Sequence, residues 1–158
     1  MSQKIDQVDI LTRREIEAGV AGPLIKAFAA EIGEEKAMEI AGRVIASHAK
    51  ESGQMLRDFV GGNTLEHFSE GMSLWSKGDA IEVDVLEQAP DKLSMNVTRC
   101  RYAEMYREMG LEDQGFLLSC GRDYAMVEGF NPKIKLTRTQ TIIEGADYCD
   151  FRFEVKDD

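Results

Sequence analysis

The stretch Ala146-Asp147-Tyr148-Cys149-Asp150-Phe151-Arg152-Phe153-Glu154-Val155, near the end of the chain, decides the fold. Successive side chains of a β-strand point to opposite faces of the sheet. The residues that would share the apolar face are Cys149, Phe151, Phe153 and Val155. The stretch therefore predicts a half-buried strand whose apolar face looks into the core, with Cys149 at the inner end of that face.

The composition is ordinary for a soluble globular protein. The chain has 158 residues, 43% hydrophobic and 30% charged, which suits one domain with a sizeable core. A formal net charge of −10 argues against non-specific binding to nucleic acid or to an anionic membrane. We find no signal core at the N-terminus and no run that could span a bilayer, so we expect a cytoplasmic protein.

The first helix is predicted from a capping pattern followed by helical periodicity. Thr12 and Glu15 have the spacing of a capping box. The apolar residues expected on the inner face of this helix are Ile16, Val20, Leu24 and Phe28. Gly19, Gly22 and Pro23 interrupt the pattern, which favours a kink or two helices.

Beyond the first helix, the hydrophobic period changes several times along the chain. We expect helices over about 34–59 and 65–77, strands over 81–85 and 93–97, helices over 101–109 and 115–128, and strands over 134–143 and 146–155. The strands would form two hairpins, the second turning around Gly145. This order predicts a single α+β domain, helical over about 10–78 and α+β over about 79–156. Its antiparallel sheet of about four strands would have helices packed on one face.

The three cysteines are the residues most suited to chemistry. In a reducing compartment, Cys100, Cys120 and Cys149 are expected to be free thiols, metal ligands or catalytic groups. Cys120 would face inward from its helix, with Asp123 three residues on beside it. Cys100 opens a helix between two arginines, an arrangement that lowers a thiol pKa. For each thiol taken alone, the competing interpretation is that it fills the core.

Other motifs are few. Arg138 and Gln140 alternate with apolar residues on a predicted strand, where they would be available to bind a carboxylate or an amide. His48 and His67 form no recognisable Cys–His pair. The sequence has no phosphate loop, nucleophile elbow or CxxC pair, which excludes a zinc ribbon.

Four segments in the C-terminal half together resemble a known family. In order they are Arg99-Cys100-Arg101-Tyr102-Ala103-Glu104, Cys120-Gly121-Arg122-Asp123, Thr137-Arg138-Thr139-Gln140-Thr141 and Gly145-Ala146-Asp147-Tyr148-Cys149-Asp150-Phe151-Arg152-Phe153. Residues from about 80 to 156 resemble the L-2-amino-thiazoline-4-carboxylic acid hydrolase family in this set. The helical half fits more loosely. The resemblance also implies a distant kinship with small ligand-binding domains of the TRAPP and vinyl-reductase type.

The first functional hypothesis is a hydrolase that opens a small cyclic substrate, such as 2-amino-thiazoline-4-carboxylate, at non-peptide C–N or C–S bonds. A thiolate would add to the ring carbon between sulfur and nitrogen, and water would resolve the covalent intermediate. Cys120 or Cys149 would be the nucleophile, with Cys100 nearby. Asp123 would hold the amidinium-like nitrogen or move a proton.

Substrate binding would fall to basic and amide side chains of the same motifs. Arg138 or Arg101 would pair with the substrate carboxylate, and Gln140 would contact the substrate as well. The hypothesis requires no cofactor.

The second hypothesis is a non-catalytic module that binds a small ligand or zinc. Cys100, Cys120, Cys149 and Asp123 would then hold Zn²⁺ in a closed tetrahedral site. The apolar stripe of residues 65–75 suits either a core or a partner, so the helical half also allows a homo-oligomer. Both hypotheses require the thiols to meet in one cavity with Asp123.

Overall fold

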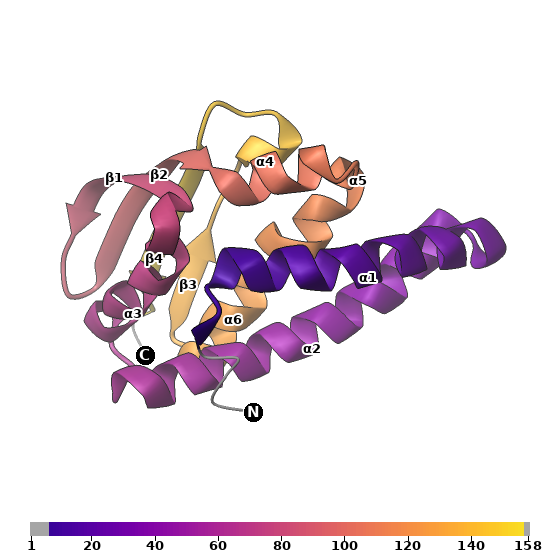
Figure 1. Cartoon of the computed structure of the whole chain (residues 1–158). Helices are drawn as coiled ribbons and strands as arrows, with labels where there is room; N and C mark the ends of the chain where they lie inside the picture. Colours follow the sequence, from indigo (N-terminus) through magenta and orange to yellow (C-terminus); the bar gives the residue numbers. More distant parts are fainter. Residues whose placement is uncertain (1–6, 157–158) are drawn as a thin grey trace.

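The chain folds into an antiparallel sheet with helices covering one face (Figure 1). The computed structural model describes residues 7–156. The helices are α1 (Ile10–Ile32), α2 (Glu34–Val60), α3 (Leu65–Met72), α4 (Arg101–Glu108), α5 (Glu112–Gly115) and α6 (Arg122–Phe130), with 3₁₀ segments η2 (Ser73–Asp79) and η4 (Ile142–Glu144) and a π-helical turn, η3 (Phe116–Cys120). The strands are β1 (Ile81–Gln88), β2 (Lys92–Cys100), β3 (Ile134–Thr137) and β4 (Cys149–Val155). This arrangement confirms the α+β prediction.

The C-terminal strand lies inside the sheet, as its alternation predicts. The strand order is β1-β2-β4-β3, so β4 has a partner on each side. Cys149 and Phe153 are 4% and 2% exposed and look into the core. On the opposite face, Arg152 donates 2.8 Å and 3.0 Å hydrogen bonds to the Met95 carbonyl and the Asn96 side chain of β2. The sheet therefore presents an apolar inner face to the helices and a polar outer face.

The core between sheet and helices is built on aromatic contacts. The ring of Phe68 on α3 lies 5.1 Å from the ring of Phe130 on α6 and 5.2 Å from that of Phe153 on β4. All three side chains are at most 2% exposed. Aromatic rings contribute large buried areas and prefer such tilted contacts. These rings tie α3, α6 and the inner face of the sheet together.

Helices α2 and α6 touch through their backbones. A Cβ atom on Gly53 of α2 would lie 2.0 Å from the carbonyl oxygen of Met126 on α6. Reciprocally, a Cβ atom on Gly129 of α6 would lie 2.0 Å from the carbonyl oxygen of Lys50 on α2. Only glycine fits at such a distance. We call this pair of contacts the Gly53–Gly129 contact, and it sets the position of α6.

The first helix differs from prediction at its start and in its continuity. Its N-cap is Asp9, whose carboxylate accepts a 2.8 Å hydrogen bond from the Thr12 N–H, so Thr12 lies inside the helix. Aspartate caps a helix at least as well as threonine. The helix also continues through Pro23, so the alternative of two helices is wrong. Packing against α2 and α4 supports the helix (Figure 1).

The predicted inner face of α1 is also wrong. Ile16, Val20, Leu24 and Phe28 are 64%, 63%, 51% and 57% exposed. The face that packs instead carries small residues, with Ala18 and Gly22 buried. A Cβ atom on Gly22 would lie 2.7 Å from the side chain of Leu111, so a close approach of backbone to core selects this face.

The second hairpin is shorter than predicted, because a carboxylate replaces part of the strand ladder. Strand β3 ends at Thr137, and residues 138–141 are irregular. The Asp150 carboxylate accepts 2.9 Å hydrogen bonds from the N–H groups of Thr139 and Gln140, and a 2.7 Å bond from the Thr139 hydroxyl. These backbone donors are satisfied without a ladder. The predicted strand over 134–143 is therefore wrong beyond Thr137.

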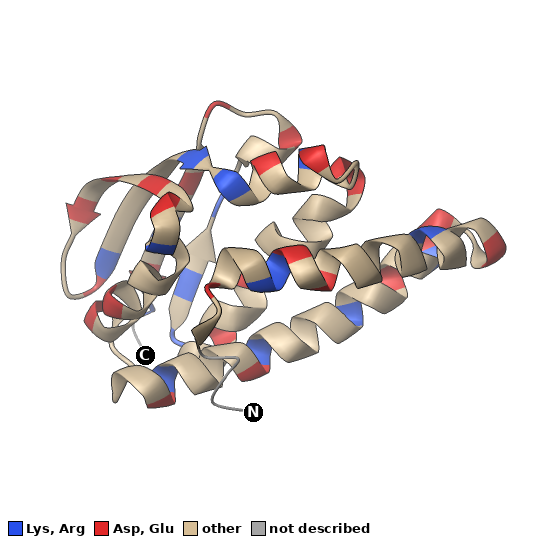
Figure 2. Cartoon of the chain, viewed as in Figure 1, with Lys and Arg blue, Asp and Glu red and all other residues tan. Residues whose placement is uncertain are grey.

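The outer strand β1 is irregular and acidic. Its pairing with β2 shifts register between Glu82 and Val83 and again between Val85 and Glu87. Figure 2 shows acidic residues on this strand and spread over the helices, in line with the negative net charge. In residues 7–156 we find no helix long and apolar enough to cross a membrane.

We expect Gly53→Ala to destabilise the protein by about 3 kcal/mol, because the new methyl group would collide with the α6 backbone rather than with a movable side chain. The matched control is Gly19→Ala on α1, where the nearest atom to a Cβ is 4.0 Å away. Alanine favours a helix over glycine, so this variant should be neutral or slightly more stable. Chemical unfolding of both variants tests this, and equal stabilities would contradict a backbone contact.

Candidate functional site

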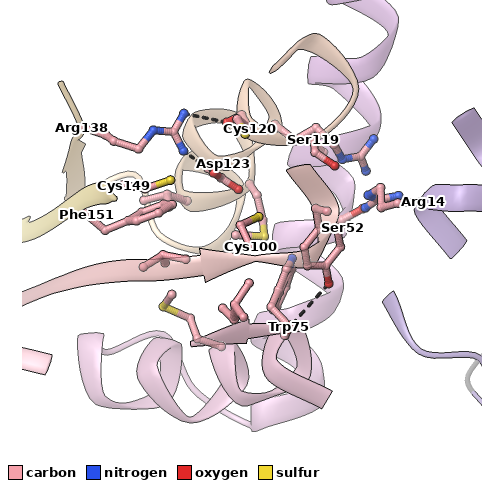
Figure 3. A pocket seen from close by; sticks show the side chains of 18 of the residues that line it. Arg14, Ser52, Trp75, Cys100, Ser119, Cys120, Asp123, Arg138, Cys149 and Phe151 are labelled. Atoms are coloured by element: carbon pink, nitrogen blue, oxygen red, sulfur yellow. Dashed lines mark hydrogen bonds and ion pairs between the residues drawn. The ribbon is translucent and has the colours of Figure 1, made fainter. Parts of the chain in front are cut away.

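The three thiols and Asp123 line one cavity between the inner face of the sheet and the helices (Figure 3). The cavity has a volume of about 120 Å³. Cys100, Cys120, Cys149, Asp123 and Arg138 all contribute to its wall. The meeting of distant thiols that both sequence hypotheses require is therefore present.

The sheet brings two of the thiols to one end of neighbouring strands. Cys100 is the last residue of β2 and Cys149 the first of β4. The strands are antiparallel and Cys149 pairs with Val97, so the two cysteines lie near the same end of the sheet. Helix α6 adds Asp123 in its first turn, and the residue before its N-cap is Cys120.

The segment before α6 departs from the predicted helix over 115–128. Residues Phe116–Cys120 form a π-helical turn, closed by a 2.6 Å hydrogen bond from the Gly121 N–H to the Phe116 carbonyl. The wider turn changes the direction of the following side chains, and both Ser119 and Cys120 line the cavity. Single π turns inside helices are frequent at functional sites.

Arg138 holds Asp123 and the end of the π turn. Its guanidinium donates a 2.5 Å hydrogen bond to the Asp123 carboxylate and a 2.9 Å bond to the Cys120 carbonyl. Its side chain is 1% exposed. The guanidinium carbon lies 5.0, 5.3 and 5.7 Å from the ring centroids of Phe151, Tyr124 and Phe116. Arg138 is therefore a buried cation whose charge is balanced by Asp123 and by aromatic faces.

Burial decides the ionisation of Cys100. It raises the pKa of this thiol to about 11, although the N–H groups at the start of α4 oppose the rise. The arginines on either side point elsewhere: Arg99 pairs with Glu104, and Arg101 donates a 2.8 Å bond to the Gly78 carbonyl. The predicted lowering of the Cys100 pKa is therefore wrong, because desolvation outweighs the helix N-terminus.

The other two thiols are also held in the protonated form, with different balances. Burial and then the charge of Asp123 raise the pKa of Cys120 well above its usual value. Burial raises the pKa of Cys149 too, but two groups oppose it. The Ile142 N–H donates a 3.2 Å hydrogen bond to the Cys149 sulfur, and Arg138 supplies positive charge nearby. The thiolate of Cys149 thus has two stabilising neighbours.

Asp123 is the carboxyl group of the cavity wall. Burial raises the pKa of its carboxyl, and the guanidinium of Arg138 opposes the rise. A carboxylate with a raised pKa is a stronger proton acceptor than one in water.

Two predicted substrate-binding residues lie outside the cavity wall. Arg101 binds the Gly78 carbonyl, and the Gln140 amide donates a 2.9 Å hydrogen bond to the Tyr148 carbonyl. Both hold backbone. Among the three residues predicted for substrate binding, Arg138 alone lines the cavity.

The sequence interpretation missed two arginines of the cavity wall. Arg14 comes from α1 and Arg122 from α6. The available signal was the segment Cys120-Gly121-Arg122-Asp123, in which Arg122 separates two residues already selected. The hydroxyls of Ser52 and Ser119 line the same cavity.

In residues 7–156, no group of three or more His, Cys, Asp or Glu side chains is arranged to hold a metal ion. The zinc-binding alternative gains no support from this geometry.

Comparison with known proteins adds a family and a fold. The family model described as L-2-amino-thiazoline-4-carboxylic acid hydrolase matches residues 13–153. No curated protein sequence matches the chain.

Two solved structures share the fold at low sequence identity. One is the phenol-responsive sensory domain of the transcription activator PoxR, solved with phenol, at 13% identity and a TM-score of 0.55, covering 85% of this chain and 72% of that one. The other is subunit 3 of the trafficking protein particle complex of Naegleria fowleri, covalently bound to palmitic acid. It is 11% identical, with a TM-score of 0.55, and covers 92% of this chain and 96% of that one. At these identities the likeness concerns the fold alone, and it confirms the predicted TRAPP-like fold.

We expect all three thiols to react slowly with iodoacetamide at neutral pH, because burial keeps them protonated. The rate should rise by about tenfold per pH unit between pH 7 and 9, as the thiolate fraction grows. Mass spectrometry of the alkylated protein gives the rate for each cysteine, with unfolded protein as the control. Rapid alkylation of any one thiol at pH 7 would show that its pKa is not raised.

Proposed function

The chain belongs to the L-2-amino-thiazoline-4-carboxylic acid hydrolase family, and from this premise we propose that it opens a small cyclic substrate such as 2-amino-thiazoline-4-carboxylate by cysteine nucleophilic catalysis. The observation that carries the proposal is the convergence of three thiols, Asp123 and Arg138 on one cavity. Nucleophile, proton acceptor and cation are the groups that the hydrolysis of an amidine-like carbon needs.

The size of the cavity favours a single small ring. An apolar cavity of roughly 150 Å³ in another protein takes a benzene ring. At about 120 Å³, the present cavity suits a five-membered ring with small substituents. Its wall includes Phe68, Trp75 and Phe151, which supply apolar surface for the ring face.

We assign the nucleophile to Cys149. Its sulfur receives the Ile142 N–H and lies in the field of Arg138, and both favour the thiolate. In the ligand-free cavity burial still outweighs them. A protonated, amidinium-like substrate would bring a further positive charge next to the thiol and lower its pKa when the reaction needs it.

The reaction then follows in two stages. The Cys149 sulfur adds to the carbon between ring sulfur and ring nitrogen, and the thiol proton passes to Asp123. The ring C–S bond breaks, and the departing sulfur takes the proton from Asp123. Water next attacks the same carbon, the bond from that carbon to the Cys149 sulfur breaks, and a proton of the water returns to the departing Cys149 thiolate. The product leaves with an open chain and a free thiol. Arg138 keeps the Asp123 carboxylate in place throughout.

The test is turnover of 2-amino-thiazoline-4-carboxylate, measured as substrate consumed and ring-opened product formed, by chromatography. We expect Cys149→Ser to lower kcat by at least about a thousandfold, because a hydroxyl replaces the attacking sulfur. Cys100→Ser, which alters a thiol of the same wall, serves as the matched control and should retain most of the activity. Loss of activity in Cys120→Ser but not in Cys149→Ser would move the nucleophile to Cys120. Activity in all three variants would refute thiol catalysis.

A second candidate function is binding of a small ligand without turnover. It is favoured by the apolar wall of the cavity and by the likeness to a sensory domain solved with phenol. The two functions differ in one experiment, in which the protein is incubated with 2-amino-thiazoline-4-carboxylate and, separately, titrated with phenol by calorimetry. Ring opening supports the hydrolase, whereas phenol binding without ring opening supports the ligand-binding module.

A further inference from the structure

Arg122 is a buried cation that has no carboxylate partner among residues 7–156. Its residue is 8% exposed, and it lines the cavity. Among residues 7–156, its hydrogen-bonding partner is the Nδ1 atom of His48, at 3.2 Å, and it forms no ion pair. A guanidinium has five N–H donors, and burying such a group with a single hydrogen-bonding partner is costly.

Arg138 lines the same cavity as Arg122 but differs from it in its partners. Arg138 is bound to Asp123 at 2.5 Å and is covered by aromatic rings, so its charge is already balanced. Arg122 is the neighbour of Asp123 in sequence, but Asp123 makes its ion pair with Arg138. The positive charge that is free to receive an anionic ligand therefore belongs to Arg122.

A second guanidinium reinforces the positive charge. Arg14 of α1 lines the cavity with a side chain 13% exposed and forms an ion pair with Glu17, which is itself half exposed. The pKa of Arg122 is lowered to about 10, first by burial and then by the charge of Arg14, so the two cations lie close enough to repel each other. An anion between or beside them would relieve that repulsion.

Arg14 lies on a different side of the cavity from the proposed nucleophile, and its charge acts on Arg122. Figure 3 shows Arg14 and Ser52 at one side and Arg138 and Cys149 at the other, with Asp123 between them. The two sides of the cavity therefore differ: Arg14 lies at one side, and Cys149 lies at the other beside Arg138.

We infer that Arg122, assisted by Arg14, forms an anion subsite that binds the carboxylate of the substrate and sets the specificity for carboxylated rings. This inference rests on the proposed function and deepens it. The ring then lies with its carboxylate toward Arg122 and its amidine-like carbon toward Cys149 and Asp123. Arg138 becomes a positioning residue for Asp123 rather than the group that binds the substrate carboxylate.

The first test is equilibrium binding, which does not depend on turnover. The probe is thiazolidine-4-carboxylate, a saturated ring that lacks the amidine-like carbon, and the control ligand is thiazolidine without the carboxylate. We expect the wild-type protein to bind the carboxylated ring at least tenfold more tightly by calorimetry, and Arg122→Gln to abolish this difference. Arg101→Gln, a surface arginine outside the cavity wall, is the matched control and should bind like the wild type.

The second test asks whether Arg122 has only a structural role. If the role of Arg122 is to bind an anionic ligand, Arg122→Gln removes an unbalanced buried charge from the ligand-free protein. The substitution should then raise the Tm of that protein by a few degrees. Arg122→Lys should keep part of the preference for the carboxylate. A structural arginine would instead give a lower Tm with both substitutions.

The outcomes separate this inference from the proposed function. Selective binding of the carboxylated ring that is lost in Arg122→Gln supports the subsite, even if no substrate is hydrolysed. Equal binding of both rings by the wild type, or an unchanged preference in a folded Arg122→Gln or Arg14→Gln/Arg122→Gln protein, overturns it, even if the enzyme is active. With an active enzyme, kcat/KM for 2-amino-thiazoline-4-carboxylate should fall about a hundredfold in Arg122→Gln, while that for 2-amino-thiazoline stays unchanged.

Discussion

The contact of two helix backbones at Gly53 and Gly129 is the constraint on which the cavity depends. Carbonyl oxygens of each helix occupy the space where a Cβ atom of the other would stand, so α6 has one position against α2. Asp123 and Arg122 lie in the first turn of α6, and the π turn before it carries Cys120. The aromatic contacts of Phe68 then join α6 to the sheet that supplies Cys149. Packing between α2 and α6 thus determines where the side chains of the cavity wall meet.

Electrostatics divides the cavity into a balanced and an unbalanced part. Around Asp123 and Arg138, opposite charges and hydrogen bonds compensate burial, and the pair is well suited to keep a carboxylate in one orientation. Around Arg122 and Arg14 two positive charges lie near each other, and in the part of the chain that the structure describes no acidic group binds Arg122. The three thiols of the cavity stay protonated because desolvation outweighs the local groups that favour the thiolate. The proposed substrate is a zwitterionic ring and would complement both parts at once. Its carboxylate would face Arg122, and its amidine-like carbon would face Asp123.

Local hydrophobic periodicity could predict much of this fold. The remaining features depend on tertiary contacts that outweigh the local sequence pattern. Strand β4 was predictable because alternation over 149–155 has one consistent solution, and the helices α2 and α4 follow their caps and apolar spacing. The packing face of α1 was not, because a close approach at Gly22 outweighed the larger apolar side chains. The pKa of Cys100 was mispredicted since sequence shows the helix start but not the burial. The carboxylate of Asp150 ended β3 early, and no spacing rule indicates that it would reach back over eleven residues.

The edges of the sheet have a consequence for the behaviour of the protein at high concentration. Unpaired strand edges can recruit strands from other molecules and so start aggregates. Here one edge is β1, bent by two register shifts and lined with acidic side chains, and the other is β3, which offers only four residues. At the β1 edge, charge repulsion and irregular geometry disfavour pairing with another strand. At the β3 edge, few backbone groups are available to pair. Both features should protect the folded protein from fibril growth by edge-to-edge addition.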